Sequence, residues 1–271
     1  MRHLLISIFS FALFLPLLAN AGLSAHRKAN QSFSQAKAIA TGFRFYSFDL
    51  QIQADESGED LTRKTDPESL AKPLDKLKIA DIPDVGSYSD LENQFDYVRD
   101  TRFLETSDPA FPRRLTWLYP DDGCFARAEL AAEHLVSNNF VLPKKVFAFG
   151  DLSADTTNSP SGSVQWWYHV AVIYRVGDQA YVLDPAINPK VPMTLQEWSS
   201  AIGGDKVPVT FAVCSKDTFD PDSDCLKPTA LSTQDAESEQ RAYLNSEWDR
   251  LLELNRDPQK ELGEFPPWLA H

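Results

Sequence analysis

Residues 164–185 read VQWWYHVAVIYRVGDQAYVLDP, and this stretch decides the fold class of the chain. It contains two runs, 164–176 and 179–184, that are rich in aromatic and β-branched residues, as strands are. Only Gly177 and Asp178 separate the runs, and a glycine-containing pair of this kind is typical of the tight turn of a β-hairpin. The stretch therefore predicts two adjacent antiparallel strands.

The length of this turn determines which side chains share a face. With a two-residue turn, Val176 lies opposite Gln179, and His169 and Asp184 project from one face as diagonal neighbours. Such neighbours are about 7–8 Å apart at the backbone, which is within reach of their side chains. A turn of four residues would keep this arrangement, whereas a turn of three residues would break it.

A second stretch, YPDDGCFARAELAAEHL at 119–135, places Cys124 where a turn gives way to a helix. The two aspartates before Gly123 are suitable helix caps, Gly123 allows a sharp turn, and strong helix formers predict a helix over 124–138. The positive end of the helix dipole favours a thiolate at Cys124, although the two aspartates oppose it.

Cys124, His169 and Asp184 together have the composition of a catalytic triad. A histidine whose ring N–H donates to a carboxylate keeps one orientation, and its other nitrogen is free to take a proton from a thiol. Backbone N–H groups at the start of a helix, including that of Cys124, suit an oxyanion hole, whose second donor the sequence does not identify. Each residue also has a purely structural interpretation: a buried or disulfide-bonded cysteine, a core histidine, and an aspartate that ends a strand before a proline.

Trp166 and Trp167 lie just before His169 on the first strand of the hairpin. They are interpreted either as packing residues of the hairpin or as substrate-binding residues. Because side chains alternate between the two faces of a strand, we expect Trp167 on the side of His169.

The rest of the chain supplies further regular elements. Strands are predicted at 145–149 and 209–214, and helices at 90–105, 193–202 and 233–255. Together with the hairpin, these elements indicate an α+β fold in which an antiparallel sheet packs against helices.

The first residues, MRHLLISIFSFALFLPLLANA (1–21), combine a basic start, an apolar run and small residues at positions 19 and 21. This pattern predicts a secretory signal peptide that is cleaved after Ala21. A membrane anchor is the competing interpretation, but the run Leu4–Ala19 has 16 residues, includes Pro16, and is shorter than the roughly 20 residues that span a bilayer. We therefore expect a secreted or periplasmic protein without a membrane anchor.

Residues 22–86 are less regular than the remainder, 87–271, which is predicted to be the catalytic domain. The apolar run FRFYSFDLQI (43–52) predicts a strand, and a charged stretch with several prolines follows it. The segment is interpreted either as a surface linker with a small N-terminal lobe or as a pro-segment that covers the site until it is removed.

Composition and cysteine usage restrict the function further. A formal net charge of −13 argues against nucleic acids and anionic membranes as partners, because both attract basic surfaces. Of the three cysteines, Cys214 and Cys225 flank a short polar stretch containing proline and aspartate, which suits a loop closed by a disulfide in an exported protein. Cys124 is then left over, either as a partner in an intermolecular bond or as a free reactive thiol.

Five short motifs follow one another in the order expected of a known family. They are GCFARA (123–128), KVFAFG (145–150), VQWWYHVA (164–171), VLDP (182–185) and KVPMTLQEW (190–198). In these motifs the chain resembles the bacterial protein glutaminases, which are secreted enzymes that deamidate glutamine side chains in proteins. The resemblance is close over 119–201.

The resemblance implies a fold related to transglutaminases and papain-like proteases, with the nucleophilic cysteine at a helix N-terminus. It places the nucleophile of the family on Cys124, its histidine on His169 and its aspartate on Asp184, and it implies no metal or organic cofactor. The expected substrates are proteins or peptides that carry glutamine. Because members of the family are made with a pro-segment that occludes the site, the resemblance also favours that role for residues 22–86.

Three alternatives share the same residues. A transglutaminase would admit an amine in place of water, and a cysteine protease would expel a backbone amine. An exported binding or inhibitor module would keep the fold without the chemistry, although such a module has no need of an unpaired thiol. The resemblance alone favours deamidation among these functions.

Overall fold

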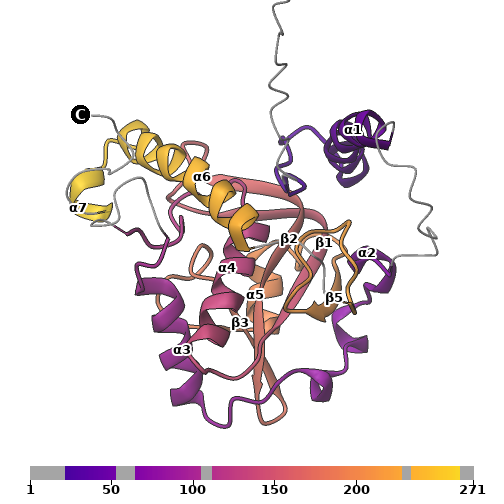
Figure 1. Ribbon diagram of the computed structural model, residues 1–271, viewed down its shortest axis with the longest axis vertical. Helices are drawn as coiled ribbons and strands as arrows, with labels where there is room; N and C mark the ends of the chain where they lie inside the picture. Colours follow the sequence, from indigo (N-terminus) through magenta and orange to yellow (C-terminus); the bar gives the residue numbers. More distant parts are fainter. Residues whose placement is uncertain (1–21, 53–64, 105–111, 228–232, 263–271) are drawn as a thin grey trace, which may run out of the picture.

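The computed structural model describes residues 22–52, 65–104, 112–227 and 233–262, and they form an α+β fold around one antiparallel sheet (Figure 1). The signal peptide predicted at 1–21 lies outside the described residues. The helices are α1 (Phe33–Ile52), α2 (Pro67–Leu70), α3 (Tyr88–Asp100), α4 (Cys124–Ser137), α5 (Leu195–Ala201), α6 (Thr233–Glu253) and α7 (Pro258–Leu262), with short 3-10 helices at Leu74–Lys76 and Ile79–Asp81. The strands are β1 (Lys144–Asp155), β2 (Ser163–Val176), β3 (Gln179–Leu183), β4 (Met193–Thr194) and β5 (Thr210–Ser215).

The five strands are arranged in the order β4-β3-β2-β1-β5, and every neighbouring pair is antiparallel. The predicted hairpin is confirmed, because β2 and β3 pair with Val176 opposite Gln179. The last pair of this ladder is Val172 with Leu183, so β2 continues beyond the end of β3. The edge of β2 is thus free of β3 at the point where His169 and Asp184 lie.

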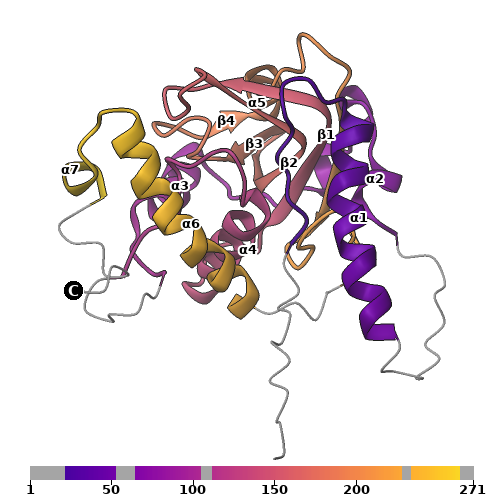
Figure 2. The same ribbon diagram turned by 90° about the horizontal axis from the view of Figure 1, so that it is seen from above.

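Helix α4 packs against β2 and also against α6 (Figure 1). Figures 1 and 2 agree that α1 lies at one side of the molecule and that α6 and α7 lie at the other. Large aromatic side chains fill the space between helices and sheet, and the indoles of Trp166, Trp167 and Trp198 are fully buried. Aromatic side chains of this size contribute much of the apolar area that a core removes from water.

One predicted element is wrong. Residues 43–52, predicted as a strand, form the second half of helix α1. The turns before them contain Ala36, Ala38 and Ala40, which are strong helix formers, and a helix that has begun extends at lower cost than a new element begins.

Residues 25–27 occupy part of the free edge of β2. The Arg27 N–H donates to the carbonyl of Gln165 at 2.9 Å, and the Trp167 N–H donates to the carbonyl of Ala25 at 3.1 Å. This N-terminal stretch therefore extends the sheet by a few residues on the side that β3 leaves open.

Residues 65–86 also join the sheet, at two other places. Lys72 and Phe211 exchange backbone hydrogen bonds of 2.8 and 2.7 Å at β5, and Arg175 of β2 pairs in the same way with Pro83 and Val85. Ile82 and Val85 are buried against the core. This part of the N-terminal region is thus bound to the sheet along its length.

The predicted disulfide between Cys214 and Cys225 is present, and it closes the loop that follows β5. The same loop is held from inside by Lys145, whose Nζ donates to the carbonyl of Thr218 at 2.9 Å and pairs with Glu129 of α4. Both charged groups of this ion pair are buried, so removal of either would leave the other uncompensated.

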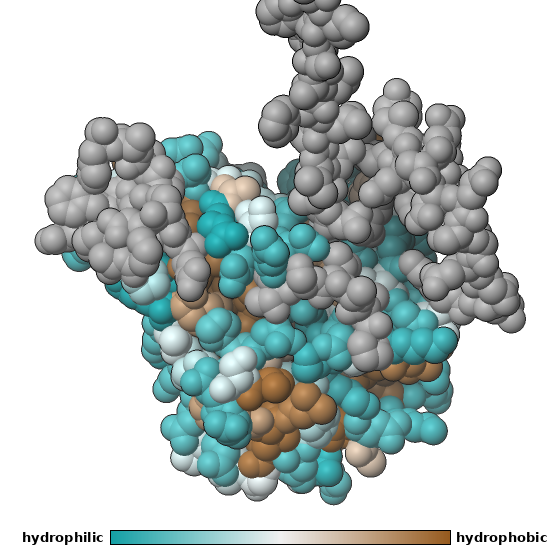
Figure 3. All heavy atoms as spheres, viewed as in Figure 1, coloured by the Kyte–Doolittle hydropathy of each residue, from teal (hydrophilic) through white to brown (hydrophobic). Residues whose placement is uncertain are grey.

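The surface is mostly polar on the face shown in Figure 3. Figure 3 shows a largely hydrophilic face, with the apolar residues gathered in a few patches. Among the described helices, none combines the length and the apolar character that crossing a membrane requires.

Candidate active site

Cys124 is the first residue of helix α4, as predicted. The N-cap is Gly123, whose φ of +76° is a left-handed conformation that glycine adopts without strain. A Cβ atom at this position would lie 2.6 Å from the ring of Tyr243 in α6, so the space also requires glycine. Asp121 and Asp122, which were predicted as caps, do not cap the helix, because the turn before it is made by the glycine.

His169 and Asp184 are brought together as the hairpin register predicted. Nε2 of His169 lies 2.8 Å from Oδ2 of Asp184, and the indole N–H of Trp198 donates to the same oxygen at 2.9 Å. Burial alone would raise the pKa of Asp184, but the His169 ring and the hydrogen bonds from His169 and Trp198 outweigh burial and lower it. An ionised Asp184 holds the Nε2–H of His169 toward itself. Nδ1 of His169 is buried and has no hydrogen-bond partner among the described residues.

The ring of His169 stacks on Trp166, with 4.5 Å between the centroids, and lies 5.7 Å from the ring of Trp198. Trp167 instead packs against Phe149 and Tyr168. The prediction that Trp167 shares the side of His169 is therefore wrong.

The physical reason lies in the neighbouring strand. The pairing of β1 with β2 changes register between Phe149 and Leu152, so that three steps along β1 correspond to two steps along β2. A bulge of this kind bends the strands and interrupts the regular alternation of side chains.

Both indoles are fully buried, and their N–H groups bind the chain itself. Trp166 donates to the carbonyls of Pro120 and Asp121 at 2.9 and 3.1 Å, and Trp167 donates to the carbonyl of Ser24 at 2.8 Å. Substrate contact by the two tryptophans stays a prediction.

Cys124 is a free cysteine and is 1% exposed. The backbone N–H of Val170, the residue that follows His169 on β2, interacts with the sulfur and favours its thiolate form. Burial raises the pKa of the Cys124 thiol to about 12; Arg127 and the Val170 N–H act in the opposite direction, whereas Asp122 and Asp184 add to the rise. Desolvation thus opposes the thiolate that the start of the helix favours.

The N-terminal stretch 22–25 covers the start of helix α4. The Ala25 N–H donates to Oδ1 of Asp122 at 2.9 Å, and the hydroxyl of Ser24 donates to the other carboxylate oxygen. Gly22 lies so close to the ring of Phe125 that a Cβ atom would come within 2.3 Å of it. These contacts place the N-terminal stretch against the two residues that flank Gly123 and Cys124 in the sequence.

Helix α6 contacts the same region from another direction. The side-chain amide of Gln240 is buried; it donates to the carbonyl of Gly123 at 3.3 Å and accepts from the hydroxyl of Thr116 at 2.9 Å. The turn that positions Cys124 is therefore held by residues more than a hundred positions away in the sequence, which no local pattern could reveal.

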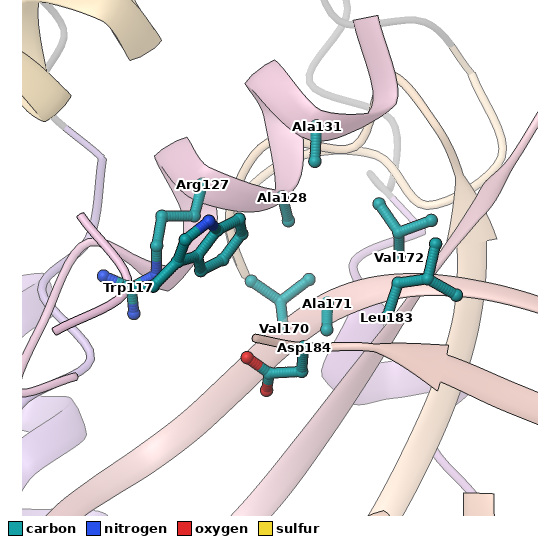
Figure 4. A pocket seen from close by; sticks show the side chains of 9 residues that line it. All are labelled: Trp117, Arg127, Ala128, Ala131, Val170, Ala171, Val172, Leu183 and Asp184. Carbon is teal, nitrogen blue, oxygen red and sulfur yellow. The ribbon is translucent and has the colours of Figure 1, made fainter. Parts of the chain in front are cut away.

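A small cavity lies beside the site, between α4 and the β2–β3 hairpin (Figure 4). Its α4 side is formed by Arg127, Ala128 and Ala131, and Asp184 lies on the opposite side. Arg127 and Trp198 were not singled out by the sequence reasoning. Both lie within the motifs GCFARA and KVPMTLQEW, which were the available signal for them.

No group of three or more histidine, cysteine, aspartate or glutamate side chains suited to a metal ion occurs in the described part of the chain. What the site contains is a thiol at a helix start, an imidazole and a carboxylate. An α+β protein with these three groups on a helix, on a strand and directly after the adjacent strand has the components of a thiol-dependent acyl-transfer site.

Comparison with known proteins agrees with this class. Residues 91–202 match the family model described as glutaminase, and this segment contains Cys124, His169, Asp184 and Trp198. The resemblance to the protein glutaminases is confirmed by this match for the segment that it covers. The fold class predicted from the resemblance, an antiparallel sheet packed against helices with the cysteine at a helix N-terminus, is also confirmed.

Solved structures of similar proteins carry the same family name. A crystal structure of protein-glutaminase is 25% identical, covers 59% of this chain and 89% of its own, and has a TM-score of 0.44. A crystal structure of pro-protein-glutaminase is 25% identical, with coverage of 68% and 62% and a TM-score of 0.43. The NMR structure of protein-glutaminase from Chryseobacterium proteolyticum is 25% identical, with coverage of 60% and 86% and a TM-score of 0.44. No curated protein matches the chain significantly.

Proposed function

We propose that this chain is an exported protein-glutamine glutaminase, which hydrolyses the side-chain amide of protein-bound glutamine to glutamate and ammonia through a cysteine thioester. One arrangement carries the proposal: Asp184 orients His169 through a 2.8 Å contact, and Cys124, the first residue of α4, interacts with the backbone N–H of Val170, the residue after His169. The match of this segment to the glutaminase family model supports the choice of reaction.

The first half of the reaction forms the thioester. Nδ1 of His169 takes the proton of the Cys124 thiol, and the sulfur attacks the carboxamide carbon of the glutamine side chain. Backbone N–H groups in the first turn of α4 have no intrahelical acceptor and stabilise the resulting oxyanion. The carbon–nitrogen bond then breaks, and His169 returns its proton to the departing ammonia.

The second half is hydrolysis. A water molecule gives a proton to His169 and attacks the thioester carbon, the carbon–sulfur bond breaks, and the thiolate regains the proton. The products are a glutamate side chain and the free Cys124 thiol. Asp184 stays ionised throughout and stabilises the imidazolium that forms in each half.

Part of the N-terminal region has the properties of a removable pro-segment. Residues 22–27 cover the start of α4 and the edge of β2, and Cys124, His169 and Asp184 are each at most 3% exposed. Because residues 65–86 join the sheet through backbone hydrogen bonds, we place the releasable part within 22–52 and the catalytic unit from residue 65 onward. The disulfide supports an oxidising, extracytoplasmic location for the protein.

The proposal is tested with a chain that begins at Gly22 and with the same chain carrying Leu23→Ala, which weakens the cover. Each is incubated with a glutamine-rich protein, and released ammonia and the mass of the substrate are recorded. Deamidation releases ammonia and converts amides to acids without chain cleavage. Cleaved peptides would indicate a protease, and cross-linked products a transglutaminase. The Cys124→Ser substitution is made in whichever of the two chains releases more ammonia. Equal ammonia release with and without this substitution would refute the enzymatic proposal.

A further inference from the structure

Arg127 is a buried cation that makes no direct ion pair, although its charge helps to lower the pKa of the buried Asp184. It lies one turn after Cys124 on α4 and is 2% exposed. Its Nη1 donates to the carbonyls of Tyr119 and Asp122 at 3.1 and 2.8 Å, and its guanidinium lies 6.0 Å from the ring of Trp117. Within the described residues it makes no ion pair with any carboxylate.

The other half of the guanidinium is unused. Nη2 is buried and has no hydrogen-bond partner in the described structure, and the same is true of the indole nitrogen of Trp117. Both side chains line the small cavity of Figure 4, whose free space of about 10 Å³ for the centre of a water molecule is enough for one such molecule. Asp184 lies at the same cavity.

A buried charge without a partner is costly, so proteins retain one where an anion is present at some stage. The nearby carboxylate, that of Asp184, is already occupied by His169 and Trp198. The carboxylate of Asp122 accepts from the N–H groups of Ala25 and Gly123. A further anion of the site, the Cys124 thiolate, arises only during the reaction, three positions before Arg127 on the same helix. Burial raises the pKa of this thiol, and the Arg127 charge acts against that rise.

Arg127 also fixes the loop that leads into the nucleophile. The carbonyls of Tyr119 and Asp122 accept from Arg127, whereas those of Pro120 and Asp121 accept from Trp166. Four consecutive carbonyls are thus held by two buried side chains. Because Trp166 stacks on His169, the same contacts link the loop before Cys124 to the imidazole.

Resting on the proposed function, we infer that Arg127 is a positioning residue that stabilises the Cys124 thiolate by its charge and holds residues 119–122 by its hydrogen bonds. The positive charge of Arg127 favours ionisation of the Cys124 thiol, which desolvation would otherwise keep protonated. The hydrogen bonds keep the first turn of α4 aligned with His169.

The test compares Arg127→Met, Arg127→Gln and Arg127→Lys with a matched control, Arg175→Met. Arg175 also donates to two backbone carbonyls, those of Ile82 and Gly177, but it lies at the far end of β2. The rate of Cys124 alkylation by iodoacetamide is followed against pH, and the midpoint of each profile is compared. Midpoints, unlike absolute rates, do not depend on how often the covered site opens.

Loss of the charge in the Met and Gln variants is expected to raise the midpoint of the alkylation profile by about one pH unit or more. At a pH below the midpoint, this shift corresponds to a roughly tenfold smaller fraction of Cys124 thiolate. The Lys variant should stay close to wild type, and Arg175→Met should not differ from it. Equal midpoints for Arg127→Gln and Arg127→Lys would overturn the inference, and this comparison remains decisive if the Met variant does not fold. Alkylation does not require turnover, so a failure of the proposed deamidation would be seen separately in the ammonia assay.

Discussion

The cover over the candidate site makes a quantitative prediction for Leu23→Ala. Leu23 is 3% exposed; its N–H donates to Asp220 at 3.2 Å, and its carbonyl accepts from the hydroxyl of Tyr168. Truncating a buried leucine to alanine costs about 2–5 kcal/mol, and the lower part of this range, about 2–3 kcal/mol, suits a residue in a terminal segment that relaxes easily. The substitution leaves the backbone hydrogen bonds in place, so the loss falls on packing.

The packing energy lost in Leu23→Ala shifts the equilibrium from the form in which residues 22–27 lie against the sheet toward the form in which they are detached. Since each 1.4 kcal/mol is tenfold in an equilibrium constant, the uncovered fraction should rise roughly 30- to 150-fold. Cys124 reacts only in that fraction, and when the cover closes faster than the thiol reacts, the alkylation rate follows the uncovered population. We therefore expect iodoacetamide to modify Cys124 about 30 to 150 times faster in Leu23→Ala, as measured by intact mass against time.

A matched control separates local opening from general loss of stability. Leu135→Ala removes another buried leucine, 0% exposed, from the last turn of α4. It should lower the free energy of unfolding by a similar amount and leave the alkylation rate near that of wild type. If both variants accelerate alkylation equally, or if neither does, the N-terminal stretch is not what protects Cys124.

Three further predictions concern the site and its support. Folding lowers the pKa of Asp184, so its ionisation stabilises the fold above the unfolded pKa of 3.8, and this contribution is lost as the pH falls below that value. The free energy of unfolding in urea should therefore be lower for Asp184→Asn than for wild type by a constant amount from neutral pH to about 5. This difference should shrink below pH 4. A deficit that does not vary with pH would contradict this. Replacing Cys214 and Cys225 by serine opens a loop with a sequence separation of 11 and should cost about 3 kcal/mol in the chain-entropy model, whereas an unchanged unfolding midpoint would show that the bond does not constrain the unfolded chain. Gly123→Ala forces a left-handed alanine against the Tyr243 ring and should cost about 2–4 kcal/mol of stability, part of which Tyr243→Ala should restore if the ring is the obstacle.

The central pair of the site was predictable because hairpin geometry is local. A two-residue turn fixes the register of the two strands, and the register places His169 and Asp184 on one face. Helix α4 with Cys124 at its start was predictable for the same reason, since a glycine followed by strong helix formers is a local signal.

The rest depends on interactions that local patterns do not contain. The stacking of Trp166 on His169 occurs beside a register change in the pairing of β1 with β2, and the helical state of residues 43–52 follows from the alanine-rich turns before them. The second partner of Asp184 comes from α5, and the partner of the Asp122 carboxylate at the start of α4 comes from a residue about a hundred positions earlier. Such contacts are properties of the tertiary structure.

The N-terminal stretch also pairs with the sheet, through a short bridge between His26 and Trp166. Where β3 ends, it satisfies the backbone of Gln165 and Trp167, which would otherwise form an open sheet edge. Open edges pair with other extended chains, including further copies of the same protein. The cover thus doubles as protection of solubility, and an uncovered form should remain monomeric only while an extended chain occupies that edge.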